Sequence, residues 1–300
     1  MLAEDYRQII AACFPALTIS SCAIHSQGWD SVAVMVNDQL IFRFAKRRDV
    51  EPQYAIEDRL LPALARELSI ENEELSMSSR RSIPDVAFFW PGGAAYPGIF
   101  IGHHLIEGVQ LTAAHLTPEH VDLIARQLGE FLSALHRFPV EQATRLGVSG
   151  GDQAAWQQRY QEQFEQIQSR VLPLLAQAAR VRFVRDWQAF LNDSARFSTT
   201  LLHRDLASEH ILYNAARGTI SGIIDWGDTA IGDPAIDFAG LLADYGEDFM
   251  ERVLAHYQGP ADASFRQRTR FYLSAMPINT LLFGLDTAQA QYVRAGLAEL

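Results

Sequence analysis

The chain has 300 residues, 48% of them hydrophobic and 20% charged, a composition typical of a folded globular protein that argues against disorder. Its formal net charge of -11 disfavours nucleic acid as a partner and would attract a cationic small molecule. The two cysteines are too few for a disulfide framework, and no apolar run reaches the roughly 18 residues of a membrane span. Because charged residues precede any apolar run at the N-terminus, unlike in a signal peptide, we expect a cytoplasmic protein with no membrane partner.

The first hundred residues predict strands with one helix among them. Residues 31–36 and 40–45 are apolar runs joined through Asn37 and Asp38, a turn signal at hairpin spacing, so we expect an antiparallel pair. Residues 54–68 carry apolar side chains at helical spacing. Residues 97–104 combine an apolar run with turn residues, and we expect the first lobe to end near them.

The rest of the chain predicts mainly helices around one further hairpin. Residues 117–135 and 152–192 have helical patterns, the second with a break near Pro173. Residues 211–213 and 220–224 are short apolar runs separated by a turn-rich linker, which predicts a β-hairpin. The segment after this hairpin again predicts helices.

The stretch from His203 to Asp228 combines the residue types that phosphoryl transfer needs. The reaction requires an in-line acceptor oxygen, a carboxylate that takes its proton, and magnesium on the phosphate oxygens. Asp205 is the candidate carboxylate. His210 stands where the protein-kinase pattern H-R-D-x-x-x-x-N has its metal-binding Asn, and Asp225 stands where kinases have the Asp of D-F-G. His210 and Asp225 are therefore candidate Mg²⁺ ligands, and folding of the hairpin between them should bring both carboxylates to the same end.

The chain resembles the aminoglycoside phosphotransferase family, and most closely its 2''-phosphotransferase branch, within the kinase-like superfamily. That branch likewise carries His at the position of His210. The resemblance implies an α+β, bilobal protein-kinase-like fold. Residues 1–102 would form an N-terminal antiparallel sheet lobe that binds the nucleotide, and residues 103–300 a larger, mostly helical lobe for catalysis and substrate binding. The segments that carry the resemblance are His203–Leu206, His210–Leu212, Gly222–Asp228, Ile231–Ala235 and the pair Asp237 and Phe238.

The resemblance implies nucleotide-binding roles for several residues of the first lobe. Arg43 occupies a strand position that usually holds the cation directed at the nucleotide phosphates, and Lys46, the only lysine, is the alternative. Period-2 alternation puts these two side chains on opposite faces, so both cannot face the cleft without a bulge. Glu57 on the following helix would pair with the strand cation. Gly28 lies in the loop expected to cover the phosphates.

The resemblance also implies a hinge at residues 97–104, whose backbone groups would bind the purine edge. Phe100, Ile101, Gly102 and His103 are the expected contacts. Because a hinge backbone can serve ATP as well as GTP, the sequence leaves both donors open. The shape behind Phe100 is expected to decide between them.

Carboxylates after the motif are candidates for binding the acceptor. Asp244, Glu247 and Asp248 could pair with ammonium groups near Asp205, although a solvated helix face is an equal alternative. Related enzymes commonly place an acid in the helix that matches residues 272–284, and this chain has none there. That departure favours a less cationic, more apolar acceptor such as a macrolide.

Other conspicuous residues are expected to be structural. Asp233 before Pro234 resembles a helix N-cap, and Asp237 matches the family aspartate that braces the catalytic loop. His136 is expected to be a core or surface histidine. An aromatic stripe expected in the core consists of Trp156, Tyr160 and Phe164.

The leading interpretation is a monomeric phosphotransferase that moves the γ-phosphate of ATP or GTP, with Mg²⁺, to a hydroxyl of a small molecule. An aminoglycoside antibiotic is the favoured acceptor, with a macrolide or other small molecule as the alternative. A second class of function is a catalytically inactive nucleotide-binding module. Two features suggest it: the loop around Gly28 contains only one glycine, and the strand position that often holds a lysine carries Arg43.

Overall fold

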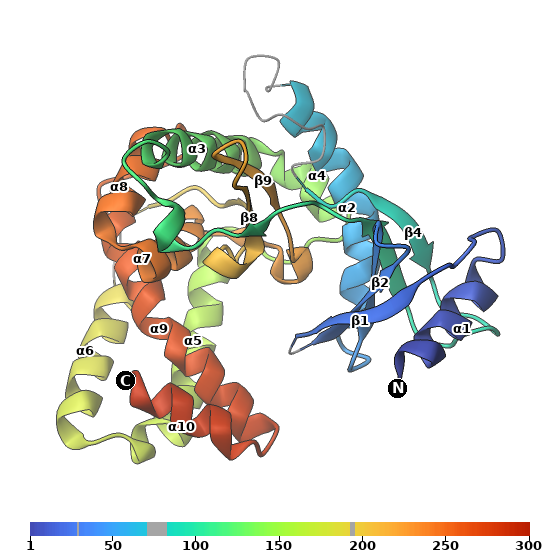
Figure 1. Ribbon diagram of the computed structural model, residues 1–300. Helices are drawn as coiled ribbons and strands as arrows, with labels where there is room; N and C mark the ends of the chain where they lie inside the picture. Colours follow the sequence, from blue (N-terminus) through green and yellow to red (C-terminus); the bar gives the residue numbers. More distant parts are fainter. Residues whose placement is uncertain (29, 71–82, 193–195) are drawn as a thin grey trace.

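A five-stranded antiparallel sheet forms the framework of the N-terminal lobe (Figure 1). The computed structural model describes residues 1–28, 30–70, 83–192 and 196–300. The strand order is β1-β2-β3-β5-β4, so β5 lies between β3 and β4. The elements of this lobe are α1 (Ala3–Cys13), β1 (Cys22–Gln27), β2 (Ser31–Val36), β3 (Leu40–Ala45), α2 (Glu51–Ile70), β4 (Val86–Trp90) and β5 (Phe100–His104).

The predicted hairpin of β2 and β3 is confirmed, and its turn residues explain the register. Val36 pairs with Leu40, while Asn37 and Asp38 take left-handed φ angles of 56° and 55°. Asparagine and aspartate tolerate this region better than most other residues. The Asn37 side chain also accepts a hydrogen bond from the Ser20 amide at 2.7 Å, which ties the hairpin to the segment before β1.

The two faces of the sheet have different roles. Phe42, Phe44 and Phe100 belong to the aromatic core shared with α1, where Phe44 and Phe100 stack with ring centroids 4.4 Å apart. Gly102 makes room for this packing, because a Cβ there would lie 2.5 Å from Phe42 Cε1. Arg43 projects from the opposite face and contacts α2. The sheet therefore separates the aromatic core from the face that carries the strand cation.

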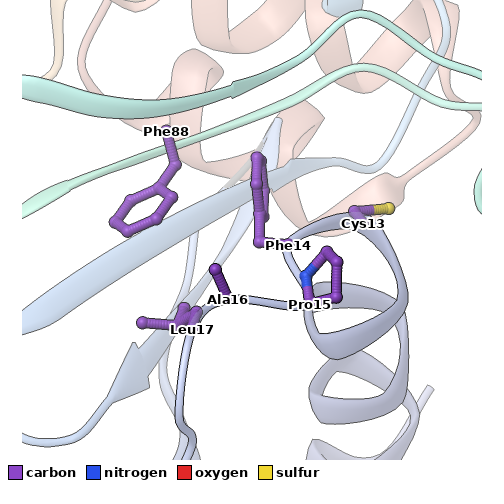
Figure 2. Close-up of a pocket in the computed structure, with 6 residues that line it drawn as sticks. All are labelled: Cys13, Phe14, Pro15, Ala16, Leu17 and Phe88. Carbon is purple, nitrogen blue, oxygen red and sulfur yellow. The ribbon is translucent and has the colours of Figure 1, made fainter.

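A small apolar hollow lies on the α1 side of this sheet. Figure 2 shows Phe14 and Phe88 beside it, and the centroids of these two rings are 5.2 Å apart. The hollow is on the side away from Arg43, so it is separate from the strand cation. It has a volume of about 370 Å³ and is lined by Cys13, Phe14, Pro15, Ala16, Leu17 and Phe88.

The C-terminal lobe is mostly helical and contains two small sheets (Figure 1). β7 (Thr200–Leu202) pairs with β10 (Ala230–Gly232), and β8 (Ile211–Asn214) lies between β6 (Val109–Gln110) and β9 (Thr219–Ile223). The predicted second hairpin is thus confirmed as β8 and β9. The helices are α3 (Val121–Arg137), α4 (Val140–Arg145), α5 (Gln153–Arg170), α6 (Gln177–Leu191), α7 (Ala239–Tyr245), α8 (Glu247–Ala255), α9 (Phe265–Asp286) and α10 (Ala290–Ala298).

Most helices lie where the sequence predicted them, although α1 was not predicted and α2 begins at Glu51 rather than at residue 54. The break predicted near Pro173 is confirmed as the short turn between α5 and α6. The helix expected from residue 117 begins only at Val121, because residues 118–120 form a separate turn before it. Within the four described ranges, no helix is long and apolar enough to cross a membrane.

Aromatic rings hold α5, α6 and α9 together. Phe190 of α6 stacks on Phe271 of α9 with centroids 3.8 Å apart, and Phe164 of α5 stacks on Trp187 of α6 at 5.6 Å. Such rings contribute strongly to a core because each buries a large apolar surface. The predicted aromatic stripe is therefore confirmed as core, and its other members in this cluster are Trp156 and Tyr160.

Asp233 joins the segment before α7 to α9. Its Oδ1 accepts a hydrogen bond from the Ala235 amide at 3.1 Å, which confirms the predicted capping role. Its Oδ2 accepts hydrogen bonds from Arg268 Nε at 2.6 Å and from the Tyr272 hydroxyl at 2.7 Å. Asp233 and Arg268 are 0% and 2% exposed, so this ion pair is shielded from water.

Replacing Asp233 with alanine should lower the free energy of unfolding by about 3 kcal/mol, because Arg268 would lose its buried partner. Urea denaturation measures this loss. Arg266→Ala is the matched control, since Arg266 is 52% exposed in its pair with Glu251 and should contribute less than about 1 kcal/mol. Equal effects of the two substitutions would contradict the assignment of Asp233 and Arg268 as a buried stabilising pair.

Candidate functional site

A buried carboxylate, Asp237, holds the loop that carries Asp205. Its Oδ2 accepts a hydrogen bond from the His203 amide at 2.9 Å, and its Oδ1 accepts one from the Arg204 amide at 2.6 Å. Arg204 has a φ of 71°, a left-handed conformation that is costly for a residue other than glycine. The bracing role expected of Asp237 is confirmed, and these two hydrogen bonds support the conformation of the loop.

Two side chains from distant parts of the second lobe hold Asp237 in turn. His136 Nε2 lies 3.1 Å from Asp237 Oδ2, and His136 Nδ1 lies 2.7 Å from the Tyr257 hydroxyl. Because a carboxylate only accepts, Nε2 of His136 donates the hydrogen bond to Asp237. The side chains of His136 and Asp237 are fully buried. The sequence pattern around His136 carries no signal for this contact, because its partner lies 101 residues away.

His203 connects the Asp205 loop to the segment that leads to Asp225. Its Nε2 donates a hydrogen bond to the Ile224 carbonyl oxygen at 3.0 Å, and its Nδ1 accepts one from the Asp205 amide at 3.3 Å. Burial lowers the pKa of His203, so the ring is neutral near neutral pH. The neutral ring can therefore donate with one nitrogen and accept with the other.

His210 lies between Asp205 and Asp225. Its Nδ1 donates a hydrogen bond to the Asp205 carbonyl oxygen at 2.7 Å and lies 3.4 Å from Asp205 Oδ2. Its Nε2 lies 3.6 Å from Asp225 Oδ2. The β8–β9 hairpin therefore brings the two carboxylates to one end, as the sequence predicted. The backbone hydrogen bond fixes the ring so that Nε2 is on the Asp225 side.

The environment of Asp205 changes its acidity. Burial raises the pKa of Asp205 to about 6, with Asp228 and Asp225 acting in the same direction and His210 opposing them. The side chain is still 43% exposed, so an external molecule can reach it. A carboxyl group whose pKa lies near the operating pH suits general acid–base chemistry.

Arg43 links the two lobes. Its Nη1 donates a hydrogen bond to Glu57 Oε2 at 2.9 Å, and its Nη2 donates one to Asp225 Oδ1 at 2.7 Å. Its guanidinium carbon also lies 5.4 Å from the centre of the Tyr54 ring. Arg43 and Glu57 have side chains 12% and 1% exposed, so their ion pair is largely desolvated. The guanidinium thus joins β3, α2 and the segment after β9.

Lys46 lies apart from this group. Its Nζ donates a hydrogen bond to the Gly28 carbonyl oxygen, and its amide donates one to the Asp30 carbonyl oxygen at 2.7 Å. Gly28 is exposed, and the nearest atom to a Cβ built there is the Ser31 carbonyl oxygen at 3.8 Å. The structure therefore places Arg43 beside Asp225, while Lys46 ties the end of β3 to the loop after β1.

The crossing between the lobes lies later than the sequence predicted. The expected hinge contacts, Phe100 to His103, are all inside β5, which pairs with β3 on one side and β4 on the other. The backbone of Phe100, Ile101 and Gly102 is therefore engaged in the sheet, and the side chains of the first two are completely buried. Because β5 continues to His104, the sheet extends past the predicted boundary at 102 and the chain crosses at 105–108.

Two of the three acids expected to bind an acceptor already have partners. Asp244 Oδ2 accepts a hydrogen bond from the Ser208 amide at 2.6 Å, and Glu247 forms an ion pair with Arg270. Asp248 is exposed in the first turn of α8. Asp244 therefore supports the chain just after Asp205, and the acceptor-binding role of Asp244, Glu247 and Asp248 stays a prediction.

A cavity of about 430 Å³ lies next to this region, a size suited to a small molecule. Ala243 of α7 lines it together with residues of α6, of α9 and of the last two positions of the chain. Its wall is mainly apolar, with a few charged groups. The lining residues are Leu175, Ala179, Arg182, Phe183, Asp186, Trp187, Ala243, Leu273, Ser274, Met276, Pro277, Glu299 and Leu300.

The chain is similar to known phosphotransferases in sequence and in fold. The model of a phosphotransferase enzyme family matches residues 21–268. Viomycin phosphotransferase from Streptomyces vinaceus is 26% identical over 298 residues, which cover 98% of each chain. A structure of APH(2")-IIia in complex with GDP and kanamycin has a TM-score of 0.85 at 27% identity, covering 98% of this chain and 96% of that chain. The macrolide 2'-phosphotransferase MphH from Brachybacterium faecium shares the fold, with a TM-score of 0.76 at 23% identity over 99% and 98% of the two chains.

The raised pKa of Asp205 should make stability depend on pH. Because the folded-state pKa is about 6, above that of an ordinary carboxyl group, ionisation of Asp205 favours unfolding as pH rises. Asp205→Asn cannot ionise and should be more stable than the wild type at about pH 8, with a smaller advantage at about pH 4.5. Urea denaturation at both pH values measures this difference.

Asp248→Asn is the matched control for the pH experiment, because it removes the same charge from an exposed position on α8. A gain in the free energy of unfolding of Asp205→Asn that is the same at both pH values would contradict a pKa of Asp205 raised by burial.

Proposed function

The chain belongs to the phosphotransferase enzyme family, and we propose that it transfers the γ-phosphate of ATP or GTP to a hydroxyl group of a small-molecule antibiotic. The observation that carries this proposal is the placement of His210 between Asp205 and Asp225, with Arg43 bound to Asp225 from the other lobe. Such an arrangement supplies a base, a metal-side carboxylate and a phosphate-side cation in one place.

Asp205 is proposed to act on the acceptor. Its carboxylate orients the acceptor hydroxyl and takes its proton while the hydroxyl oxygen forms a bond to the γ-phosphorus. The bond from that phosphorus to the bridging oxygen breaks, and the nucleoside diphosphate leaves with the electron pair. The raised pKa of Asp205, about 6, leaves the carboxyl ionised at neutral pH and basic enough to accept the proton.

The chain offers a partial set of ligands for Mg²⁺. Within the described ranges, no group of three or more His, Cys, Asp or Glu side chains could hold a metal ion. Kinase-type sites bind Mg²⁺ through one or two protein carboxylates together with substrate phosphates and water, and Asp225 fits that requirement. His210 is the second ligand we propose. When bound, Mg²⁺ would neutralise charge on the phosphate oxygens.

Arg43 is proposed as the cation for the nucleotide phosphates. Its guanidinium donates to Glu57 of α2 and, at 2.7 Å, to Asp225, where the phosphates would meet the metal. A guanidinium can grip two oxygens at once and stays charged at every physiological pH. Lys46 donates a hydrogen bond to the Gly28 carbonyl oxygen at the loop after β1. We propose that these two residues approach the phosphates from that loop.

The acceptor is proposed to be a cationic antibiotic of the aminoglycoside or viomycin type. The net charge of -11 favours attraction of a cation, and the similarity to viomycin phosphotransferase and to an enzyme bound to kanamycin points to the same class. The largely apolar cavity between α6 and α9 favours a second candidate, an acceptor with an apolar body such as a macrolide. We further propose that the chain acts as a cytoplasmic monomer.

Asp205→Asn should reduce phosphoryl transfer by about 10²–10⁴-fold, because removal of a general base has an effect of this size. Binding of the nucleotide should be retained, since Asp205 is proposed to contact the acceptor. Transfer of labelled γ-phosphate measures the first quantity, and calorimetric titration with the nucleotide measures the second. Asp38→Asn is the control, because Asp38 is exposed in the β2–β3 turn and asparagine tolerates its left-handed φ. Turnover that survives in the Asp205 variant would eliminate Asp205 as the base.

The acceptor class can be identified with purified protein, Mg²⁺, both nucleotides and one member each of three classes: viomycin, kanamycin and a macrolide. We expect phosphate to appear on viomycin or kanamycin, and a susceptible bacterium that expresses the chain should resist the same compound. Transfer only to the macrolide would support the second candidate. Nucleotide binding without transfer to any acceptor would indicate an inactive nucleotide-binding module.

A further inference from the structure

His103 is a buried histidine that the proposed chemistry does not use. It is 7% exposed and lies one residue before the end of β5, next to the crossing between the lobes. In the pairing of β3 with β5, Ile41 is opposite His103 and Arg43 is opposite Ile101. Because paired residues share a face and faces alternate along a strand, His103 lies on the same face as Arg43. Phe100 lies on the other face, so it cannot shape the nucleotide side as the sequence suggested.

The position of the proton on His103 follows from its one hydrogen bond. Its Nδ1 lies 2.9 Å from the His104 carbonyl oxygen, and a carbonyl oxygen can only accept, so Nδ1 carries the hydrogen. Burial lowers the pKa of His103 to about 4, so the ring is neutral at physiological pH. Its Nε2 is therefore a bare acceptor, and it has no hydrogen-bond partner among the residues the structure describes.

A nucleotide would place its base near this acceptor. A nucleotide with its phosphates at Arg43 and Asp225, and its base along the same sheet face toward the crossing at 105–108, would bring that base to the His103 side of β5. The Ile106 amide, three residues further along the chain, makes no backbone hydrogen bond within the described part of the chain, so the crossing also offers a donor. The edge of adenine remote from its sugar presents a donor, the 6-amino group, beside the acceptor N1. Guanine presents the reverse, an O6 acceptor beside an N1–H donor.

We propose, on the basis of the proposed function, that His103 makes this chain select ATP over GTP by accepting a hydrogen bond from the 6-amino group of adenine. Guanine in the same position would place O6 against Nε2, leaving two acceptors facing each other without a proton. A site with a buried acceptor discriminates strongly against a ligand that cannot donate to it. This chain would thus differ in donor from the structurally similar APH(2")-IIia, which was crystallised with GDP.

Equilibrium binding tests this proposal without an acceptor. Calorimetric titration of the full chain with Mg²⁺ and non-hydrolysable ATP and GTP analogues should give an affinity at least about tenfold higher for the ATP analogue. His103→Leu should weaken binding of the ATP analogue by about tenfold and leave the GTP analogue no weaker. His104→Leu is the matched control, since His104 is the adjacent histidine on the opposite face and should keep the wild-type preference.

His103→Gln provides a second variant that keeps a polar group. The glutamine amide can donate as well as accept, so this substitution should raise the affinity for the GTP analogue. The affinity for the ATP analogue should stay within about threefold of the wild-type value. Equal affinity of the wild type for both analogues, or an unchanged preference in both His103 variants, would overturn the selection by His103. Binding of neither analogue would instead overturn the proposed function together with this inference.

Discussion

The geometry of the active loop depends on one buried carboxylate. Asp237 accepts hydrogen bonds from two successive backbone amides, at His203 and Arg204, and from the His136 ring. Buried donors cost free energy when they lose an acceptor, so these groups stabilise one arrangement of the loop and oppose others. Asp205 follows immediately, and the loop that orients it is held by a residue that is 0% exposed.

The two carboxylate oxygens of Asp225 make different contacts. Oδ1 accepts from Arg43 and thereby connects the second lobe to β3, while Oδ2 is on the side of His210. The pair of Arg43 with Glu57 has little solvent around it, and such a pair is effective only when both partners are held in place. Glu57 accepts a hydrogen bond from the other nitrogen of Arg43, so the relative position of the lobes and the position of the Asp225 carboxylate are coupled through one guanidinium.

Local patterns were sufficient to predict much of the fold and part of the site. Turn residues and alternating apolar runs identified both hairpins, and the second hairpin placed Asp205 and Asp225 at the same end. Contacts between distant segments could not be predicted this way. His136 reaches Asp237 and Asp244 reaches Ser208 only after the helices have packed, and the sequence near each residue contains nothing about its partner. The hinge was placed too early because an apolar run next to turn residues shows that a strand is near its end, but not at which residue it ends.

The contact of Lys46 with Gly28 has a practical consequence for labelling. The chain contains no other lysine, so a lysine-directed reagent has one side-chain target, at the end of β3 beside the loop after β1. A fluorophore attached there would sense the surroundings of that loop from a single, chemically defined position. The sequence thus already provides a unique lysine side chain, which usually requires replacement of the other lysines, and Arg43 keeps its charge because guanidinium does not react with the same reagents.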